Sequence, residues 1–342
     1  MIKSWVFEFF GMPPELTAKF DPQRSADYFN DYLDLWPRAE LLGFEGIFFS
    51  EHHFGGAYSP SPNLLIVHTA TRTKTLRLGV MGMTLPYHQP WRIVGEIGML
   101  DHLTGGRLEI GTAAGIPNEM ALVGLSIDEA RERNDEALEI IDAALRDPVI
   151  SHHGKYLNFD NLRLVPRPLQ QPSPPLWVAV VSISSARKAA QRGAKICTGF
   201  HPNSKVKEIF DAYRDEAARL GRPAGPKQLA LRRQVSIGET ADKANRDSAI
   251  QKQRSKATLA ADPRVRMEGR EALDTPAAHA FSVGAEEFIS GTPTSVAEEI
   301  IRQCREVGAG HFLATFRGST EMARTWELYG TQVNPALARA VV

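Results

Sequence analysis

Short apolar runs alternate with longer amphipathic stretches along the chain. The runs are rich in β-branched and aromatic residues, which predicts buried strands, and the stretches between them carry apolar residues at the spacing of one helix face. Strands that alternate with helices form parallel sheets, and eight such units close most naturally into a barrel. We therefore predict an α/β fold, a (β/α)8 TIM barrel. The predicted strands are Trp5–Phe9, Gly46–Ser50, Leu76–Met83, Leu108–Thr112, Leu176–Val181, Lys195–Thr198, Leu229–Ile237 and His311–Thr315.

Glycine and proline mark the ends of the predicted helices. A left-handed residue commonly follows the last helical turn, and four glycines lie at or just past such ends. Pro37 follows Trp36 within the first helical run, so we expect a break there. The four glycines are Gly43, Gly193, Gly221 and Gly308.

One segment does not follow the alternation. Residues 251–287 are charged, contain Pro263 and Pro276, and lie between the seventh strand and the last helix. A segment of this length without a clear period is usually a lid, a small subdomain or a mobile loop. We expect a lid or insertion at 251–287 within a single barrel domain that spans residues 1–342.

Composition narrows the class of partner. The chain has 40 basic and 40 acidic side chains and no block of like charges, which argues against nucleic acid as a partner. No window approaches the ~18 consecutive apolar residues of a membrane span, so we expect no membrane segment. The two cysteines, Cys197 and Cys304, lie far apart in the sequence, which fits reduced thiols and a cytoplasmic protein.

The strongest chemical signal is Glu51-His52-His53, which directly follows the second predicted strand. In a barrel, chemistry is found at this end of the strands. These side chains favour three roles: metal ligation, acid–base catalysis by a histidine, or a purely structural histidine. Adjacent residues of a strand point to opposite faces, so His52 and His53 reach one ion only if the strand has already turned.

A second signal is a group of hydroxyls where the fifth strand runs into a helix. Ser182, Ser184 and Ser185 lie there, and a helix start with free amides favours anion binding. The alternative is that Ser184 is an ordinary helix cap. Arg131, near the start of another helix, is by itself most simply a solvated surface charge.

Four motifs follow one another along the chain: Glu51-His52-His53-Phe54, Leu85 to Arg92, Met99 to Arg107 and Gly291-Thr292-Pro293. Taken in this order, they resemble those of the bacterial luciferase-like flavin monooxygenases. The resemblance implies a barrel that binds FMN non-covalently, takes it reduced (FMNH2) from a separate flavin reductase, and forms a C4a-hydroperoxide with O2 to oxygenate a small organic substrate. Relatives that use a deazaflavin coenzyme imply hydride transfer as an alternative function. Two further alternatives are a non-catalytic flavin-binding protein and a metal-dependent hydrolase. We also expect a homodimer.

The resemblance also implies roles for single residues near the reacting part of the flavin. His52 matches the active-site histidine, and Glu51 would orient the surrounding network, whereas His53 would point away. Met81, Gly82 and Met83 match the strand beside the isoalloxazine, with a non-prolyl cis peptide at Met81-Gly82.

For the flavin phosphate, the resemblance implies Arg131 together with the hydroxyls of Ser182 and Ser185. Gly199 and Phe200, after the sixth strand, would border the ring system. The sequence departs from the luciferase pattern at Ala113, where the luciferase catalytic chain has a cysteine, and at Ala114, where a second arginine is common. Phosphate binding would therefore depend more strongly on Arg131.

Overall fold

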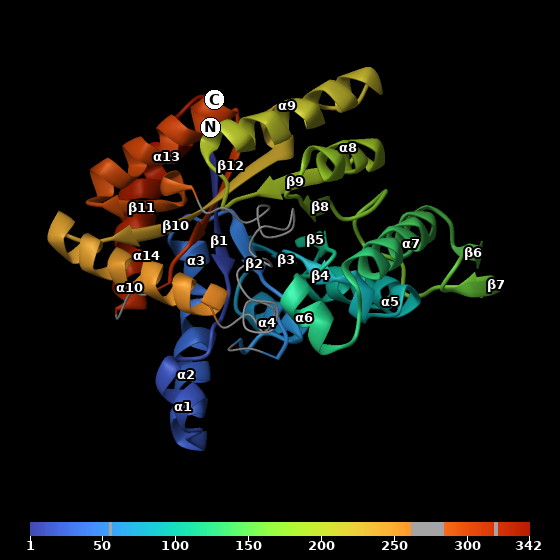
Figure 1. Ribbon diagram of the computed structural model, residues 1–342, viewed down its shortest axis with the longest axis horizontal. Coiled ribbons are helices and arrows are strands. Elements are labelled where there is room, and N and C mark those ends of the chain that lie inside the picture. Colours follow the sequence, from blue (N-terminus) through green and yellow to red (C-terminus); the bar gives the residue numbers. More distant parts are fainter. Residues whose placement is uncertain (55–56, 261–283, 318–320) are drawn as a thin grey trace. The chain divides into compact units, whose positions relative to one another are not determined.

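Parallel strands dominate the computed structural model, which describes residues 1–54, 57–260, 284–317 and 321–342 (Figure 1). Within these residues eight strands follow one another in the order β10, β12, β1, β2, β3, β5, β8 and β9, and β9 pairs again with β10, so that the sheet closes. This is the predicted (β/α)8 barrel. Its strands are β1 (Lys3–Glu8), β2 (Gly46–Phe49), β3 (Arg77–Val80), β5 (Leu108–Ala113), β8 (Leu176–Ala179), β9 (Lys195–Thr198), β10 (Leu229–Ile237) and β12 (His311–Thr315).

The helices break or end close to the proline and glycine residues that were predicted to mark their ends. The first helical run breaks at Pro37, and the four glycines that were expected to end helices all have positive φ, between 65° and 75°. The helices are α1 (Pro14–Ala18), α2 (Pro22–Leu35), α3 (Arg38–Leu41), α4 (Pro62–Thr71), α5 (Pro90–Leu103), α6 (Pro117–Leu122), α7 (Ile127–Arg146), α8 (Ile183–Arg192), α9 (Asn203–Arg219), α10 (Ala241–Ala260), α13 (Pro293–Val307), α14 (Met322–Leu328) and α15 (Asn334–Arg339).

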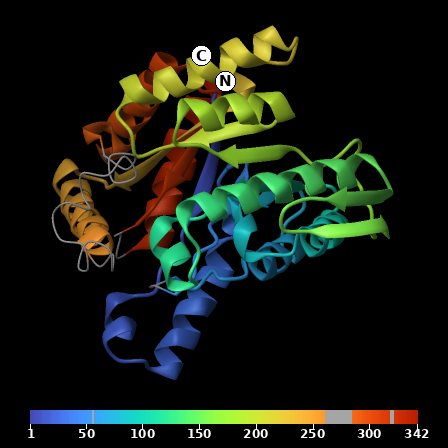
Figure 2. The ribbon, with the colours of Figure 1, turned by 45° about the vertical axis from the view of Figure 1, so that its right-hand side comes forward.

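The chain divides into two compact units. Unit 1 comprises residues 1–8, 38–47 and 179–342, and unit 2 comprises residues 9–37 and 48–178. In unit 2 the fully buried ring of Phe10 packs against aromatic side chains of α2 and against Tyr58. An antiparallel hairpin, β6 (Val149–His153) with β7 (Asn158–Arg163), follows α7 and lies near its C-terminal end (Figure 2). This hairpin was not predicted.

In unit 1, β10 is buried along its whole length and pairs with β9, β12 and the short strand β11 (Phe288–Gly291). Two adjacent arginines of β10 are buried with a single carboxylate. Arg232 and Arg233 both donate to Glu287, which is completely buried. Asn203 and Gln303 accept further hydrogen bonds from Arg233, at 2.7 and 2.9 Å, so its buried donors are satisfied.

The segment 251–287 differs in part from the prediction. Residues 251–260 are the last part of helix α10, and Ala285–Glu287 form a short 3-10 helix. Residues 261–283, which carry most of the predicted lid, lie outside the described residues.

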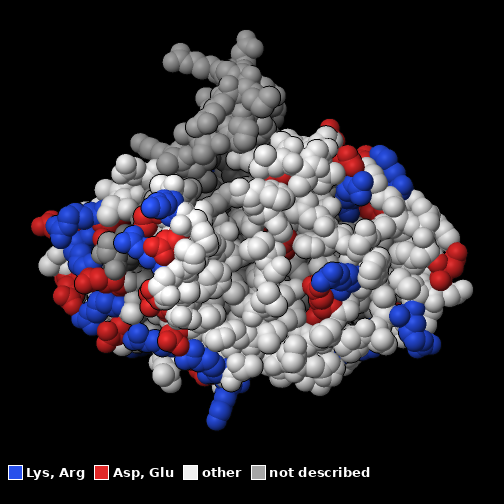
Figure 3. All heavy atoms as spheres, turned by 90° about the horizontal axis from the view of Figure 1, so that it is seen from below, with Lys and Arg blue, Asp and Glu red and all other residues white. Residues whose placement is uncertain are grey.

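Charged side chains of both signs lie on the surface of the protein (Figure 3). On the face drawn in Figure 3, basic and acidic side chains are interspersed rather than separated by sign. Among the described helices, none combines the length and the apolar character that a bilayer crossing requires.

Replacement of Glu287 by alanine tests the buried ionic cluster. The variant leaves Arg232 and Arg233 buried without their counter-ion, and removing one partner of a buried pair typically costs about 3–5 kcal/mol. We expect the free energy of unfolding in urea to fall by that order. Glu239→Ala breaks an exposed pair with Arg324 and serves as the matched control, for which we expect little change. Similar losses for both variants would show that the buried arginines do not depend on Glu287 as their counter-ion.

Candidate active site

Glu51, His52 and His53 lie in unit 2, one residue beyond the end of β2. All four residues of β2 are buried and none of them is charged, so the ionisable groups begin after the strand ends. The Glu51 side chain is only 3% exposed, whereas the imidazoles of His52 and His53 are 23% and 18% exposed. The end of β2 therefore presents two partly accessible imidazoles above a buried carboxylate.

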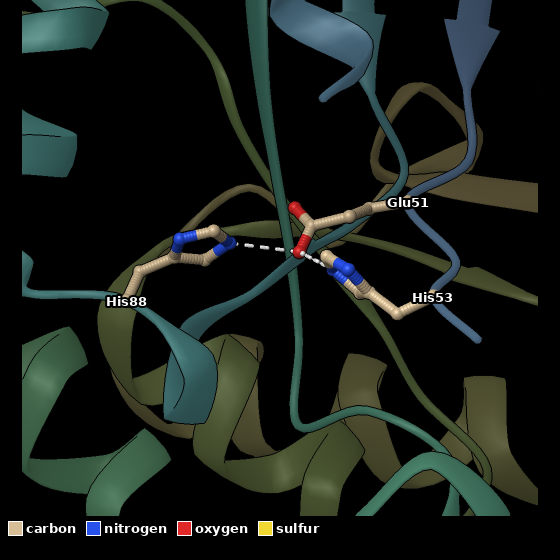
Figure 4. Close-up of side chains that lie close together, drawn as sticks. All are labelled: Glu51, His53 and His88. Carbon is tan, nitrogen blue, oxygen red and sulfur yellow. Dashed lines mark hydrogen bonds and ion pairs between the residues drawn. The ribbon is translucent and has the colours of Figure 1, made fainter. Parts of the chain in front are cut away.

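The Glu51 carboxylate lies between two imidazoles (Figure 4). Its Oε1 atom accepts hydrogen bonds from His53 Nε2 at 2.9 Å and from His88 Nε2 at 2.7 Å. His88 comes from a different part of the chain, immediately after the short helix Leu85–Tyr87 that follows strand β4 (Met83–Thr84). The three side chains thus connect the segment that follows β2 with the segment that follows β4.

These contacts shift the pKa values of two of the groups in opposite directions. Burial raises the pKa of Glu51, but the hydrogen bonds from His53 and His88 outweigh it, so that the net pKa is lowered. The pKa of His53 is raised, chiefly by its hydrogen bond to Glu51, against the opposing effect of burial. The network therefore favours an ionised carboxylate and a protonated His53.

The same three residues are the natural candidates for a metal ion, because their ligand atoms all lie within 4.8 Å of one another. Zinc ligands at about 2.0–2.1 Å from a tetrahedral ion lie roughly 3.3 Å apart. The separations of 2.9 and 2.7 Å from Glu51 Oε1 are shorter and match N–H groups that donate to a carboxylate. The geometry fits a hydrogen-bonded network better than a metal centre.

His52 has a different partner from His53. Its Nδ1 atom lies 3.0 Å from Oε1 of Glu119, and its ring stacks on Phe9 at a centroid distance of 5.5 Å. The family resemblance implied that Glu51 orients the network, but Glu51 contacts His53 and His88, and Glu119 contacts His52. The sequence did not reveal Glu119 because it lies on α6, 67 residues beyond His52. Only its position in the first turn after β5 could have drawn attention to it.

Tyr87, next to His88, places a buried hydroxyl at the same strand ends. No described residue accepts a hydrogen bond from this hydroxyl. Burial and the nearby carboxylates of Glu119 and Glu51 raise the pKa of Tyr87, so the phenol stays protonated and is available as a donor. Its ring also packs edge-on against His53, with a centroid distance of 5.5 Å.

The predicted third strand is interrupted at Met81-Gly82, which is a cis peptide bond, as the family resemblance implied. Met81 and Met83 are buried. A Cβ atom on Gly82 would lie 2.5 Å from the backbone of Thr112 in β5, so any side chain there would collide with the neighbouring strand. Glycine is thus required at this position by strand packing alone.

Arg131 lies in the second turn of α7 with its side chain 67% exposed and 3.6 Å from Asp128. Arg133, two residues further on, pairs with Glu129 and lies over the ring of Tyr156. Arg133 also lines a recess shared with His88 and Glu136. The two arginines differ in their surroundings, which the sequence did not distinguish.

The three serines predicted to bind phosphate lie in unit 1. The N-cap of α8 is Ser182, not Ser184, and Ser182 and Ser185 form a reciprocal capping box with 3.2 Å hydrogen bonds. Ser184 is exposed in the first turn. The pattern of three serines did not reveal the register of the cap, because each of them is an equally good capping residue.

Gly199 and Phe200 follow β9 and are held by the buried ionic cluster. Phe200 has a positive φ of 68°, its N–H donates to Glu287 at 2.9 Å, and the Arg232 guanidinium lies 4.0 Å from its ring centroid. A Cβ atom on Gly199 would lie 2.8 Å from Arg232. The cluster thus fixes the backbone at both positions.

The sequence profile of the luciferase-like monooxygenases matches residues 10–311, so the chain belongs to that family. The protein y4wF of Sinorhizobium fredii, itself uncharacterized, is 39% identical over 66% of each chain. The 4-hydroxyprotoasukamycin monooxygenase of Streptomyces nodosus subsp. asukaensis is 32% identical over 62% of each chain. The oxygenase component of the flavin-dependent trigonelline monooxygenase of Acinetobacter baylyi is 28% identical over 62% of this chain and 60% of its own. The chain spans no more than about two thirds of the length of these relatives.

Solved structures resemble the chain over nearly its whole length. The monooxygenase RslO1 of Streptomyces bottropensis has a TM-score of 0.84 and 25% identity, covering 98% of this chain and 99% of that one. The oxygenating constituent of 3,6-diketocamphane monooxygenase of Pseudomonas putida, in complex with FMN, has a TM-score of 0.79, 20% identity and 98% coverage of both chains. An F420-dependent secondary alcohol dehydrogenase has a TM-score of 0.75 and 17% identity, with 98% and 99% coverage. The last two establish the fold alone.

Glu51→Gln tests the imidazole–carboxylate network through its pH dependence. The lowered pKa of Glu51 contributes stability above its unfolded value of about 4.5, which is lost as the pH falls. The raised pKa of His53 contributes stability below its unfolded value of about 6.5, which is lost as the pH rises through the folded value. We expect the difference in unfolding free energy between parent and variant to be largest between about pH 4.5 and 6.5. A difference that stays constant from pH 4 to 8 would contradict the pairing.

Proposed function

We propose that the chain is an FMN-dependent monooxygenase that receives reduced FMN from a separate reductase and uses O2 to oxygenate a small organic substrate. Membership of the luciferase-like family supports the reaction class, and the trigonelline enzyme, named as an oxygenase component, supports a separate reductase. The observation that carries the proposal is His52, a partly exposed imidazole held by a buried carboxylate at the end of a barrel strand. An imidazole in this position can take up and return a proton.

The residues proposed to contact FMN are those that the family resemblance implied. In unit 2, Met81, Gly82 and Met83 would lie beside the isoalloxazine, and Arg131 would pair with the phosphate. In unit 1, Ser182, Ser184 and Ser185 would contact the phosphate at the start of α8, and Gly199 and Phe200 would border the ring. The exposed Arg131 guanidinium and the α8 amides are suitable donors for a phosphate. When bound, reduced FMN supplies the electrons that activate O2.

Within this function, the chain's own residues would manage the proton. His52 would act as the acid–base group, and Glu51 would hold His53 and His88 in place beside it. The buried Tyr87 hydroxyl would donate a hydrogen bond to an oxygen atom of a bound molecule. We further propose that the protein acts as a homodimer in the cytoplasm.

A deazaflavin-dependent hydride transfer is the second candidate. It is favoured by the fold shared with the F420-dependent alcohol dehydrogenase and by Ala113 and Ala114, which replace residues common in the luciferases. Hydride transfer needs no O2, so the two functions make different demands on the site.

Rapid mixing of the protein with FMNH2 and aerated buffer tests the proposal. A monooxygenase site that excludes water should give a long-lived near-ultraviolet absorbance band that belongs to neither reduced nor oxidised FMN. Oxidation at the rate of free FMNH2, together with tight binding of F420, would support hydride transfer instead. A metal chelator should leave the band unchanged, and loss of the band with chelator would support a metal centre at Glu51, His53 and His88.

His52→Ala tests the acid–base role. We expect the variant to fold and bind FMN, but to release hydrogen peroxide faster and to shorten the absorbance band by about 10²-fold or more, since general acid–base groups contribute ~10²–10⁴ in rate. His153→Ala, an exposed histidine of the β6–β7 hairpin, is the matched control. If both variants keep the parental lifetime, His52 is structural.

Arg131→Ala tests phosphate pairing. Only FMN carries the phosphate, so we expect FMN binding to weaken by about 10- to 150-fold, corresponding to ~1.5–3 kcal/mol for a charged hydrogen bond, and riboflavin binding to stay unchanged. Arg146→Ala, in the last turn of the same helix, is the control. Equal losses for FMN and riboflavin would remove Arg131 from the phosphate site.

A further inference from the structure

Glu119 is a buried carboxylate with two donors on a single oxygen atom. Its side chain is 8% exposed, and Oε1 lies 3.0 Å from His52 Nδ1 and accepts the backbone N–H of His53 at 3.0 Å. The turn that leads from β5 to α6 places it there. Gly115, with a φ of 92°, occupies this turn, and a Cβ atom on it would lie 2.8 Å from Thr84. Glu119 is therefore held by a constrained turn.

This contact defines where the neutral His52 ring carries its proton. An ionised carboxylate can only accept hydrogen bonds, so Nδ1 must be the protonated nitrogen and Nε2 keeps its lone pair. The stacked ring of Phe9, at an interplanar angle of 12°, fixes the plane of the imidazole. The position, plane and tautomer of His52 are thus all determined.

The neighbouring histidine has the opposite arrangement. His53 donates from Nε2 to Glu51, which leaves its Nδ1 as the unprotonated nitrogen of the neutral ring. In their neutral forms the two adjacent histidines therefore carry the proton on opposite ring nitrogens, because each has its own buried carboxylate. The two carboxylates are not interchangeable, although both lie at the same strand ends.

We propose that Glu119 is a positioning residue that holds His52 in the Nδ1–H tautomer, so that Nε2 is free to take up and return a proton. As a role in catalysis, this rests on the proposed monooxygenase function. Carboxylates that orient an imidazole in this way are used widely to fix its tautomer. Nothing else among the described residues hydrogen-bonds His52 Nδ1.

Two variants of Glu119 with side chains of similar size distinguish the effect of its hydrogen-bond acceptor from the effect of its negative charge. In Glu119→Gln, the backbone N–H of His53 can only donate, so it selects the amide oxygen at the Oε1 position, and that oxygen can still accept from His52. In Glu119→Met the acceptor is absent. Glu132, exposed on α7 and paired with Lys155, gives the matched controls Glu132→Gln and Glu132→Met.

The tautomer can be measured directly by NMR of protein labelled with 15N in its imidazoles, with His52 assigned from a His52→Gln spectrum. We expect His52 Nδ1–H in the wild type, in Glu119→Gln and in both controls, and loss of that tautomer in Glu119→Met. With FMNH2 and O2, we expect the lifetime of the absorbance band to fall on the order of 10²-fold in Glu119→Met and to stay within about tenfold in Glu119→Gln.

An Nε2–H tautomer of His52 in the wild-type protein overturns the proposal, even if no variant folds. So does a Glu119→Met variant that keeps the Nδ1–H tautomer, or a Glu119→Gln variant that loses it. The tautomer is measured without flavin, so it decides the role of Glu119 independently. A wild-type protein with the expected tautomer but no effect on FMNH2 oxidation contradicts the monooxygenase function and leaves the positioning of His52 intact.

Discussion

A carboxylate inside a protein is tolerated only where donors replace the water it loses, and the polar side chains at the end of β2 are arranged around this constraint. Glu51 is satisfied by His53 and His88, and Glu119 by His52 and the His53 backbone. Because each carboxylate takes different donors, the two adjacent histidines become chemically distinct. The imidazole that matches the family's active-site histidine is the one held by Glu119.

The same constraint organises the loop after β9 in unit 1. Glu287 is completely buried, and it is satisfied by Arg232, Arg233 and the N–H of Phe200. This last hydrogen bond, together with the guanidinium over the ring, holds Phe200 at a positive φ that non-glycine residues seldom adopt. A buried ionic cluster thus serves here to fix a backbone position that the family resemblance assigns to the flavin.

Glycine at two positions is explained by packing before any ligand is considered. Gly82 and Gly199 each lie so close to a neighbouring strand that a Cβ atom would clash, with Thr112 and with Arg232 respectively. Their presence therefore does not by itself argue for a bound flavin. Glycine at these two positions allows the neighbouring strands to approach closely at residues of the proposed site.

The sequence by itself determined the eight barrel strands, the glycine-terminated helices and the family, because apolar periodicity and the order of short motifs are local properties of the chain. It also located the cis peptide at Met81-Gly82 through the resemblance. It missed the β6–β7 hairpin, whose short strands mix apolar and polar residues without a clear alternation. Only the tertiary structure decided that Glu119 pairs with His52 and His88 with Glu51. Those partners are 67 and 37 residues apart, and a buried carboxylate selects its donors by proximity in space, which no local pattern records.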